Sequence, residues 1–201
     1  EHWQIEVQTA DITAHLVQTP QTPLHRNWLL TRDIDYTIVQ SLLNETRGSL
    51  QLGGQEYPFE GYGYCEHNWG VQPRHSTAHW LHFWASGMAG VVMDCHYDAG
   101  VPHHYTYLWQ AEEGRYLASP AHFGFDPAQP GSTWRVASPD MNLMVKPLYV
   151  HRNRMRIPPV FSYIDIDYHE LLVEVDGWAR VSGERVDIRG VGKYDHNFNR
   201  W

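Results

Sequence analysis

One short stretch of the sequence concentrates side chains that could transfer protons. The run Gly61-Tyr62-Gly63-Tyr64-Cys65-Glu66-His67-Asn68-Trp69-Gly70 places an acid, an imidazole, an amide and an indole in succession. In an extended strand, Glu66 and Asn68 point to one side, and His67 and Trp69 point to the other. An imidazole beside an aromatic wall can donate or accept a proton, because burial tunes its pKa. A structural hydrogen-bond node at one end of a sheet explains the same residues equally well.

A second copy of this pattern closes the chain. Gly190-x-Gly192-x-x-Asp195-His196-Asn197-Phe198 repeats both the glycine spacing and the order acid, histidine, asparagine, aromatic residue. The chain holds only two Gly-x-Gly triplets and only two His-Asn dipeptides, and both pairs share one offset. Short matches also arise by chance, but the shared offset favours a duplicated β unit.

The elements that must position these motifs are strands. Apolar and polar residues alternate through most of the chain, as in Trp3–Gln8, and no stretch holds a 3.6-residue apolar repeat for more than about two turns. The Gly53-Gly54 pair between two alternating runs predicts a hairpin. Ten or more strands spaced by turn residues predict an all-β fold, an antiparallel sandwich or barrel.

The domain organisation has two readings. Proline, glycine and serine cluster without strand character from Ser119 to Ser132. This segment is either a linker between two β halves, 1–118 and 119–201, each with one copy of the motif, or a long loop of a single barrel domain 1–201.

Composition limits the partners of the protein. The chain has 201 residues and a formal charge of −8, so chain-wide binding to nucleic acid is disfavoured. No apolar run approaches the ~18 residues that a membrane span needs. The two cysteines, Cys65 and Cys95, are too few for a disulfide scaffold and predict reduced core thiols, which favours a cytoplasmic location. The oligomeric state stays open.

Aromatic rings with a polar tip are in excess, with nine tryptophans, twelve tyrosines and fourteen histidines. Such rings fill sheets and also line polar-aromatic cavities. They concentrate around the first motif and in the runs Trp80–Trp84 and His103–Trp109. We therefore predict a substrate cavity lined by Tyr62, Tyr64, Trp69, Trp80, His82, Trp84, Tyr107 and Trp109.

The first motif, followed by Trp80-Leu81-His82-Phe83-Trp84 and a glycine-containing hairpin, resembles a signature of lipocalin-like β-barrel proteins. This family includes carotenoid 1,2-hydratases (hydroxyneurosporene synthases), kievitone hydratase, tocopherol cyclase and lipocalin-like Diels–Alderases. The closing run Gly190–Trp201 resembles the terminal pattern of a bacterial relative. The resemblance extends loosely over 53–201, and only the two motifs are specific.

The resemblance implies a lipocalin-like barrel that holds a hydrophobic or polycyclic small molecule without a cofactor. In the carotenoid hydratases, a His-x-Trp pair and a Tyr-x-Asp pair are thought to protonate an alkene and guide water. His67-x-Trp69 is similar to the first pair, and Asp94 to the acid of the second, where Val92 replaces the tyrosine. Hydration, cyclisation and isomerisation, reactions of the lyase or isomerase type, therefore all stay open.

The candidate catalytic residues are Glu66, His67 and Asp94, with Asp195 and His196 as the second copy; the acid is either Asp94 or Glu66, held by His67. The same barrel could instead bind an apolar or aromatic ligand without turnover. No Gly-x-Ser-x-Gly elbow, phosphate loop or Cys-x-x-Cys motif is present, which disfavours nucleophilic hydrolysis and redox chemistry by those routes.

A metal-dependent enzyme is the third hypothesis, because seven histidines crowd between His67 and His104. His82 and His96 could face each other across a hairpin, whereas His79 and His82 must point to opposite faces. No His-x-His pair exists in the chain, so we expect no metal site.

Two charged stripes alternate along later strands. Arg152, Arg154 and Arg156 form one stripe, and Asp165 and Asp167 form the other. The arginines could meet a carboxylate or phosphate, and the acids could serve acid–base chemistry. A solvated outer face is the favoured interpretation of each stripe.

Overall fold

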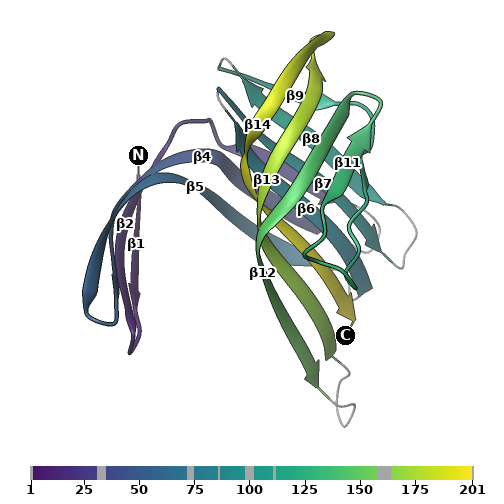
Figure 1. The fold of residues 1–201 in the computed structure, drawn as a ribbon. Helices are drawn as coiled ribbons and strands as arrows, with labels where there is room; N and C mark the ends of the chain where they lie inside the picture. The colour runs from purple at the N-terminus through teal and green to yellow at the C-terminus, as the bar shows by residue number, and fades with distance from the viewer. Residues whose placement is uncertain are drawn as a thin grey trace. The chain divides into compact units, whose positions relative to one another are not determined.

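The computed structural model describes residues 2–30, 35–71, 75–85, 87–97, 102–110, 112–157 and 164–200. All regular elements in these ranges are strands, so the prediction of an all-β fold is confirmed (Figure 1). The strands are β1 (Trp3–Gln8), β2 (Ile12–Pro20), β3 (His25–Leu30), β4 (Asp35–Leu52), β5 (Gln55–Val71), β6 (His75–Ala85), β7 (Met88–Tyr97), β8 (His103–Gln110), β9 (Glu113–Leu117), β10 (His122–Phe123), β11 (Trp134–Ser138), β12 (Met141–Ile157), β13 (Ile164–Val181) and β14 (Glu184–Arg200).

The chain forms two compact units. Unit 1 holds Glu1–Leu29 and Asp35–Gly70, and unit 2 lies mainly in Val71–Trp201. The segment 119–132 lies inside unit 2, where it contains β10 and connects β9 to β11. The division into halves 1–118 and 119–201, which was inferred partly from the repeated motif, stays a prediction.

Unit 1 is a five-stranded sheet in which β1, β2, β4 and β3 follow one another and β5 also pairs with β4. A Gly53-Gly54 turn joins β4 to β5, and both glycines have left-handed backbone angles, φ 55° and 85°. Side chains disfavour this conformation, so the glycine pair sets the position of the turn, and the predicted hairpin is confirmed.

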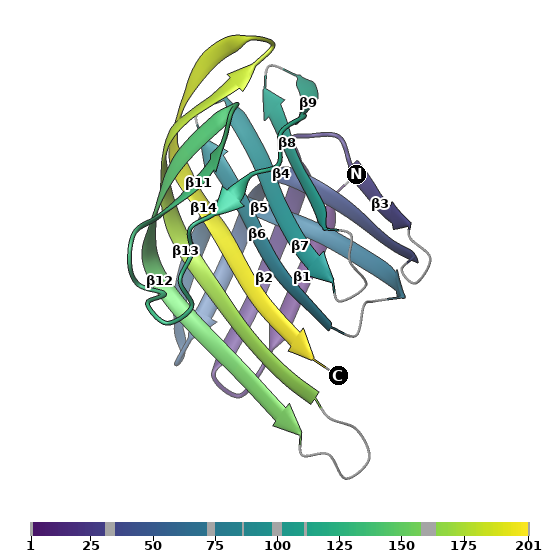
Figure 2. The same ribbon diagram turned by 90° about the vertical axis from the view of Figure 1, so that its right-hand side faces the viewer.

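Unit 2 is a nine-stranded antiparallel sheet with the order β10-β11-β12-β13-β14-β6-β7-β8-β9 (Figure 2). The sheet curls into a half-barrel, as a lipocalin-like fold requires. Its apolar core lies against one face, which we call the inner face, and includes Leu81, Val92, Leu143 and Leu171 among its fully buried members. Along residues 169–176 of β13, buried residues alternate with more exposed ones, which produces this arrangement.

The second Gly-x-Gly triplet lets β14 approach β6 closely. A Cβ atom on Gly190 would lie 1.8 Å from the Trp84 carbonyl oxygen, and one on Gly192 would lie 2.1 Å from the His82 carbonyl oxygen. The first triplet has different surroundings, because a Cβ on Gly63 would meet side chains, with Gln18 Nε2 at 2.3 Å. The two copies of the motif therefore share a spacing but not a packing role.

Candidate functional site

The inner face of unit 2 changes from apolar to polar along the strands. Antiparallel partners lie directly opposite each other, so each register row across the sheet shares one face. The row Leu171, Tyr194, Leu81, Val92, Thr106 is fully buried. One step outward from the core lies a row that is almost entirely titratable, which we call the histidine row: Arg152, His169, His196, His79, Asp94 and His104.

The centre of the histidine row packs against aromatic rings. The ring centroids of His79 and His196 are 4.8 Å apart, and those of His196 and His169 are 5.7 Å apart. Phe125, from the segment between β10 and β11, contacts both His169 and His196 with its ring. His79 Nδ1 lies 2.6 Å from the hydroxyl oxygen of Tyr194. The rings of Phe125 and Tyr194 thus form an aromatic wall beside the row.

Burial keeps these imidazoles neutral. Desolvation, with a smaller contribution from His196, lowers the pKa of His79 to about 3. Desolvation, followed by the charge of His169, lowers the pKa of His196 to about 4. It also lowers the pKa of His169, although Asp167 opposes this shift. Neutral imidazoles at this depth can accept a hydrogen bond at one nitrogen and donate one at the other.

A cavity opens next to the histidine row, at the polar end of β6, β7 and β14. This mouth cavity has a volume of about 440 Å³ and is lined by His75, Ser76, Thr77, His96, Tyr97, Phe198, Asn199 and Arg200. His96 Nε2 lies 3.0 Å from Asp94 Oδ2, so an acid–imidazole pair joins the row to the cavity. The Asp94 side chain is only 16% exposed. Volumes of this size suit small-molecule sites.

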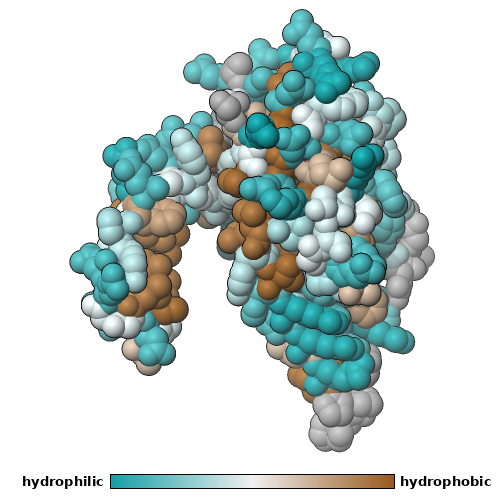
Figure 3. Space-filling view, viewed as in Figure 1, coloured by the Kyte–Doolittle hydropathy of each residue, from teal (hydrophilic) through white to brown (hydrophobic). Residues whose placement is uncertain are grey.

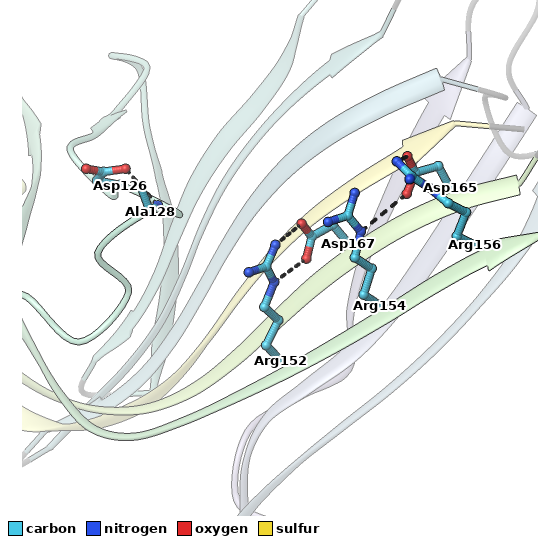
Figure 4. A network of polar contacts seen from close by, with 7 residues as sticks. All are labelled: Asp126, Ala128, Arg152, Arg154, Arg156, Asp165 and Asp167. Carbon is cyan, nitrogen blue, oxygen red and sulfur yellow. Dashed lines mark hydrogen bonds and ion pairs between the residues drawn. The ribbon is translucent and has the colours of Figure 1, made fainter.

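The charged stripes of β12 and β13 pair with each other on the inner face (Figure 4). Arg152 donates two hydrogen bonds to Asp167, the Nε–Oδ1 distance being 2.8 Å, and these bonds chiefly hold the pKa of Asp167 below its usual range. Arg156 Nη2 lies 3.1 Å from Asp165 Oδ2, and Arg154 Nε lies 3.7 Å from Asp165 Oδ1. The arginines are solvent-exposed, as expected, although they are ion-paired and share the inner face, whereas the expectation of an exposed face is wrong for the acid stripe, because Asp165 is buried.

The surface over the outer parts of β12 and β13 is polar: in Figure 3, mostly hydrophilic (teal) groups lie over the lower ends of these strands. A bulge between Pro147 and Tyr149 separates the two parts of β12. Before it, Val145 points to the core, and after it Val150 and Arg152 occupy the inner face. The bulge thus turns the arginine stripe inward, because one extra residue reverses the alternation.

The first motif lies on β5 in unit 1 and has the predicted alternation. The hydroxyl of Tyr64 donates a hydrogen bond to Glu66, and Asn68 Nδ2 donates one to Glu66 Oε1 at 3.1 Å. The rings of His67 and Trp69 contact each other, with centroids 5.2 Å apart. Glu66, His67 and Trp69 are exposed, as is Tyr62. Because Asp94 belongs to unit 2, its proposed cooperation with His67 stays a prediction.

The second copy of the motif does not combine its acid with its imidazole. His196 points to the inner face, whereas Asp195 lies on the opposite face of β14. There Lys193 Nζ lies 3.1 Å from Asp195 Oδ1 and 3.1 Å from Glu170 Oε1. Burial raises the pKa of Asp195, and Lys193 opposes that rise. Asp195 therefore belongs to a structural charge network on the outer side.

The predicted aromatic lining of β6 and β8 shares that opposite face. Trp80, His82 and Trp84 alternate with the core residues Leu81 and Phe83. Tyr107 and Trp109 are the register partners of Val91 and Ala89, which in turn oppose His82 and Trp84. These five side chains thus lie together on one face of the sheet, but on the other face from Asp94 and His196.

The structure does not support the expected histidine pair. His82 is opposite Val91 and His96 is opposite Thr77, so the prediction that His82 and His96 face each other is wrong. His79 and His82 do lie on opposite faces, as predicted. Within the described ranges, no three His, Cys, Asp or Glu side chains are arranged to hold a metal ion.

Cys65 and Cys95 are both free thiols, as predicted, but only Cys95 is buried in the core, whereas Cys65 is half-buried. In the part of the chain that the structure describes, no helix is long and apolar enough to cross a membrane.

No family model and no curated protein matches the sequence. Two solved structures have the same fold. Kievitone hydratase from Nectria haematococca superposes on the whole chain with a TM-score of 0.69 and 10% identity, and a protein assigned as an AttH from Nitrosomonas europaea superposes on 97% of it with a TM-score of 0.67 and 13% identity. The chain spans 65% and 64% of the lengths of these neighbours. Both belong to the lipocalin-like hydratase and cyclase group, so the expected lipocalin-like fold is confirmed.

Proposed function

We propose that this chain carries the site of a hydratase-type enzyme, which adds water across a carbon–carbon double bond of a hydrophobic small molecule. The fold is that of a hydratase neighbour, whose activity belongs to that protein and supports the proposal only by analogy. The observation that carries the proposal is the Asp94–His96 pair beside the mouth cavity. A positioned acid at the edge of a 440 Å³ cavity is what alkene protonation requires.

The reaction needs one proton donor, one water molecule and a surface that tolerates positive charge. The Asp94–His96 pair gives its proton to one alkene carbon, and the π electrons of the double bond form the new C–H bond. Positive charge then develops on the second carbon, where the ring face of Phe198 in the cavity wall stabilises it. Water oxygen bonds to that carbon, and the extra proton returns to the pair, so the catalyst is regenerated.

The buried part of the histidine row has a positioning role in this scheme. His79 and His196 are held neutral by burial, so they can orient a water molecule or a substrate hydroxyl without competing for the proton. Neither ring nitrogen of His169 has a hydrogen-bond partner among the described residues, although the side chain is fully buried. Such nitrogens favour a polar group of a ligand or a water nearby.

Retention of a ligand without turnover is the second candidate, and the unpartnered nitrogens of His169 favour it equally. A second possible location for the chemistry is the exposed His67–Trp69 pair of unit 1, which is similar to the His-x-Trp pair of the carotenoid hydratases. Both alternatives are separated from the leading proposal by the same set of variants.

The test is turnover of kievitone and of a panel of alkene-bearing aromatic and isoprenoid compounds in water labelled with heavy oxygen. Wild-type protein should give a product heavier by one labelled water molecule. Asp94→Asn and His96→Gln should each reduce the rate by about 100-fold or more while binding is retained. The matched control Asp187→Asn alters an exposed acid paired with Arg185 and should leave the rate unchanged.

Three results would point elsewhere. Full activity in Asp94→Asn would remove the pair from the mechanism. Loss of activity in His67→Gln alone would place the chemistry at the first motif. Tight binding with no labelled product from any compound would favour the binding protein.

A further inference from the structure

The side chain of Phe125 lies among buried nitrogen atoms that lack a hydrogen-bond partner. Its ring centroid is 5.6 Å from that of Trp134, 5.8 Å from that of His169 and 5.3 Å from that of His196. Trp134 Nε1, both ring nitrogens of His169 and Nδ1 of His196 have no partner among the described residues, and all three side chains are more than nine-tenths buried. Buried polar atoms are nearly always satisfied, so four such atoms around one phenylalanine ring point to a missing polar group.

Phe125 belongs to a segment that is tied to the sheet on one side only. Just before it, the backbone N–H of Gly124 donates a hydrogen bond to a carbonyl oxygen of β11, with an N–O distance of 2.8 Å. From 126 to 132, the hydrogen bonds to described residues stay inside the segment, as between Ala128 N and Asp126 Oδ1 at 2.8 Å (Figure 4). Because this turn is hydrogen-bonded to itself, it can move away together with Phe125 while the strands stay paired.

The chemistry of the unpartnered atoms defines the group that would satisfy them. Trp134 Nε1 only donates, so it requires an acceptor. Burial lowers the pKa of both His169 and His196, and a neutral imidazole has one donor and one acceptor nitrogen. A hydroxyl group accepts and donates at the same atom and therefore matches this set. A charged group does not, because it would lose its hydration among aromatic rings.

The space that Phe125 fills has the shape of a flat ring. Besides the three rings already named, Tyr194 contacts Phe125 with centroids 4.9 Å apart. The indole of Trp134 and the imidazole of His169 meet the Phe125 ring nearly edge to face, at 74° and 69°. An aromatic ligand in the same place would keep these contacts.

We propose that Phe125 occupies the place of a ligand, and that an uncharged aromatic molecule with a hydroxyl group displaces it and binds among Trp134, His169 and His196. The ring of the ligand takes over the contacts of the Phe125 ring, and its hydroxyl satisfies the buried nitrogens. The segment 124–132 is then a lid that closes the site with its own side chain. None of these residues lines the mouth cavity, so this site stands whether or not the hydratase proposal does.

The first experiment compares p-cresol with toluene, which lacks only the hydroxyl group, in NMR titrations of the full chain. Phe125→Ala should bind p-cresol at least about tenfold more tightly than the wild type does, because no ring has to be displaced. It should also prefer p-cresol to toluene, whereas a purely apolar cavity prefers toluene. Adding His169→Leu should reverse this preference and retain toluene binding, which also shows that the double variant is folded.

The second experiment follows the lid in the wild-type protein by fluorine NMR, with 4-fluorophenylalanine at all six phenylalanine positions. Phe125→Leu identifies the Phe125 signal. Saturating p-cresol should shift this signal, and the signal of the exposed Phe59 in unit 1 should stay unchanged as the control.

Three results would overturn the proposal. An unchanged Phe125 signal at saturating p-cresol would make Phe125 a permanent part of the core, with water on the nitrogens, and this result does not depend on the folding of any cavity variant. Equal affinity of the wild type and Phe125→Ala for p-cresol would remove the lid. A preference of Phe125→Ala for toluene would show that the nitrogens take no part in binding.

Discussion

The buried imidazole of His196 should make unit 2 sensitive to acid, and replacing it by phenylalanine should remove part of that sensitivity. His196 is 7% exposed, and its ring packs against that of Phe125 with centroids 5.3 Å apart. A phenylalanine ring is similar in size and keeps this contact. Because His196 Nδ1 has no hydrogen-bond partner among the described residues, His196→Phe should cost little stability at pH 7.

The magnitude follows from the pKa of His196, which burial lowers from 6.5 to about 4. The unfolded chain binds a proton below pH 6.5 and the folded chain only below about 4, so stability falls as the pH drops through this window. Between pH 7 and pH 4.5 the loss amounts to about 2–3 kcal/mol, at about 1.4 kcal/mol for each pH unit below 6.5. The free energy of unfolding of His196→Phe, relative to that of the wild type, should therefore rise by about 2–3 kcal/mol when the pH is lowered from 7 to 4.5.

Urea unfolding at the two pH values, followed by tryptophan fluorescence, measures this difference. Val136→Ala creates a small cavity in the same unit without removing a titrating group, so its destabilisation should be the same at both pH values. If the stability difference between His196→Phe and the wild type does not change with pH, the assignment of a neutral, buried imidazole is wrong.

Three further outcomes are expected. Arg152→Gln should raise the pKa of Asp167, measured by NMR titration, because the two hydrogen bonds that lower it are lost. Gly190→Ala should destabilise the fold by about 3 kcal/mol in urea unfolding, because the new Cβ would meet a backbone oxygen of the neighbouring strand. A thiol reagent at pH 8 should label Cys65 well before Cys95, because burial raises the pKa of the Cys95 thiol to about 12.

Each of these outcomes has a comparison that exposes an error. An unchanged pKa of Asp167 would show that the ion pair does not persist in solution. Gly131→Ala, where a Cβ would meet nothing within 4 Å, should have little effect, and equal effects of the two glycine variants would contradict the close approach of β14 to β6. Rapid labelling of native Cys65→Ser protein would show that Cys95 is accessible.

The sequence was sufficient for the fold class and for the direction of side chains within one strand. Alternation correctly separates His67 and Trp69 from Glu66, and His79 from His82, because the period of two is a local property of the backbone. The Gly53-Gly54 turn was equally predictable, since its left-handed angles favour glycine.

The assembly of the site was not predictable, because it depends on which strands pair and in what register. His196 is 117 positions from His79 and 27 positions from His169 in the sequence. The three residues are nevertheless neighbours across three strands. Asp195 and His196 are adjacent in sequence but lie on opposite faces, so a motif read as one unit is divided by the sheet. The inward turn of the arginine stripe depends on a bulge beside Pro147 that alternation alone does not reveal.

The length of β12, β13 and β14 has an evolutionary consequence. Each strand spans 17 or 18 residues, and the inner face of its core half is apolar, while that of its outer half carries charged, imidazole or aromatic side chains. Substitutions in the outer halves can alter charge and hydrogen bonding at the cavity without opening voids in the core. Substitutions in the outer halves of β12, β13 and β14 can therefore change which ligands the protein prefers. Selection for stability acts separately on the hydrophobic halves of the same strands, which preserve the fold.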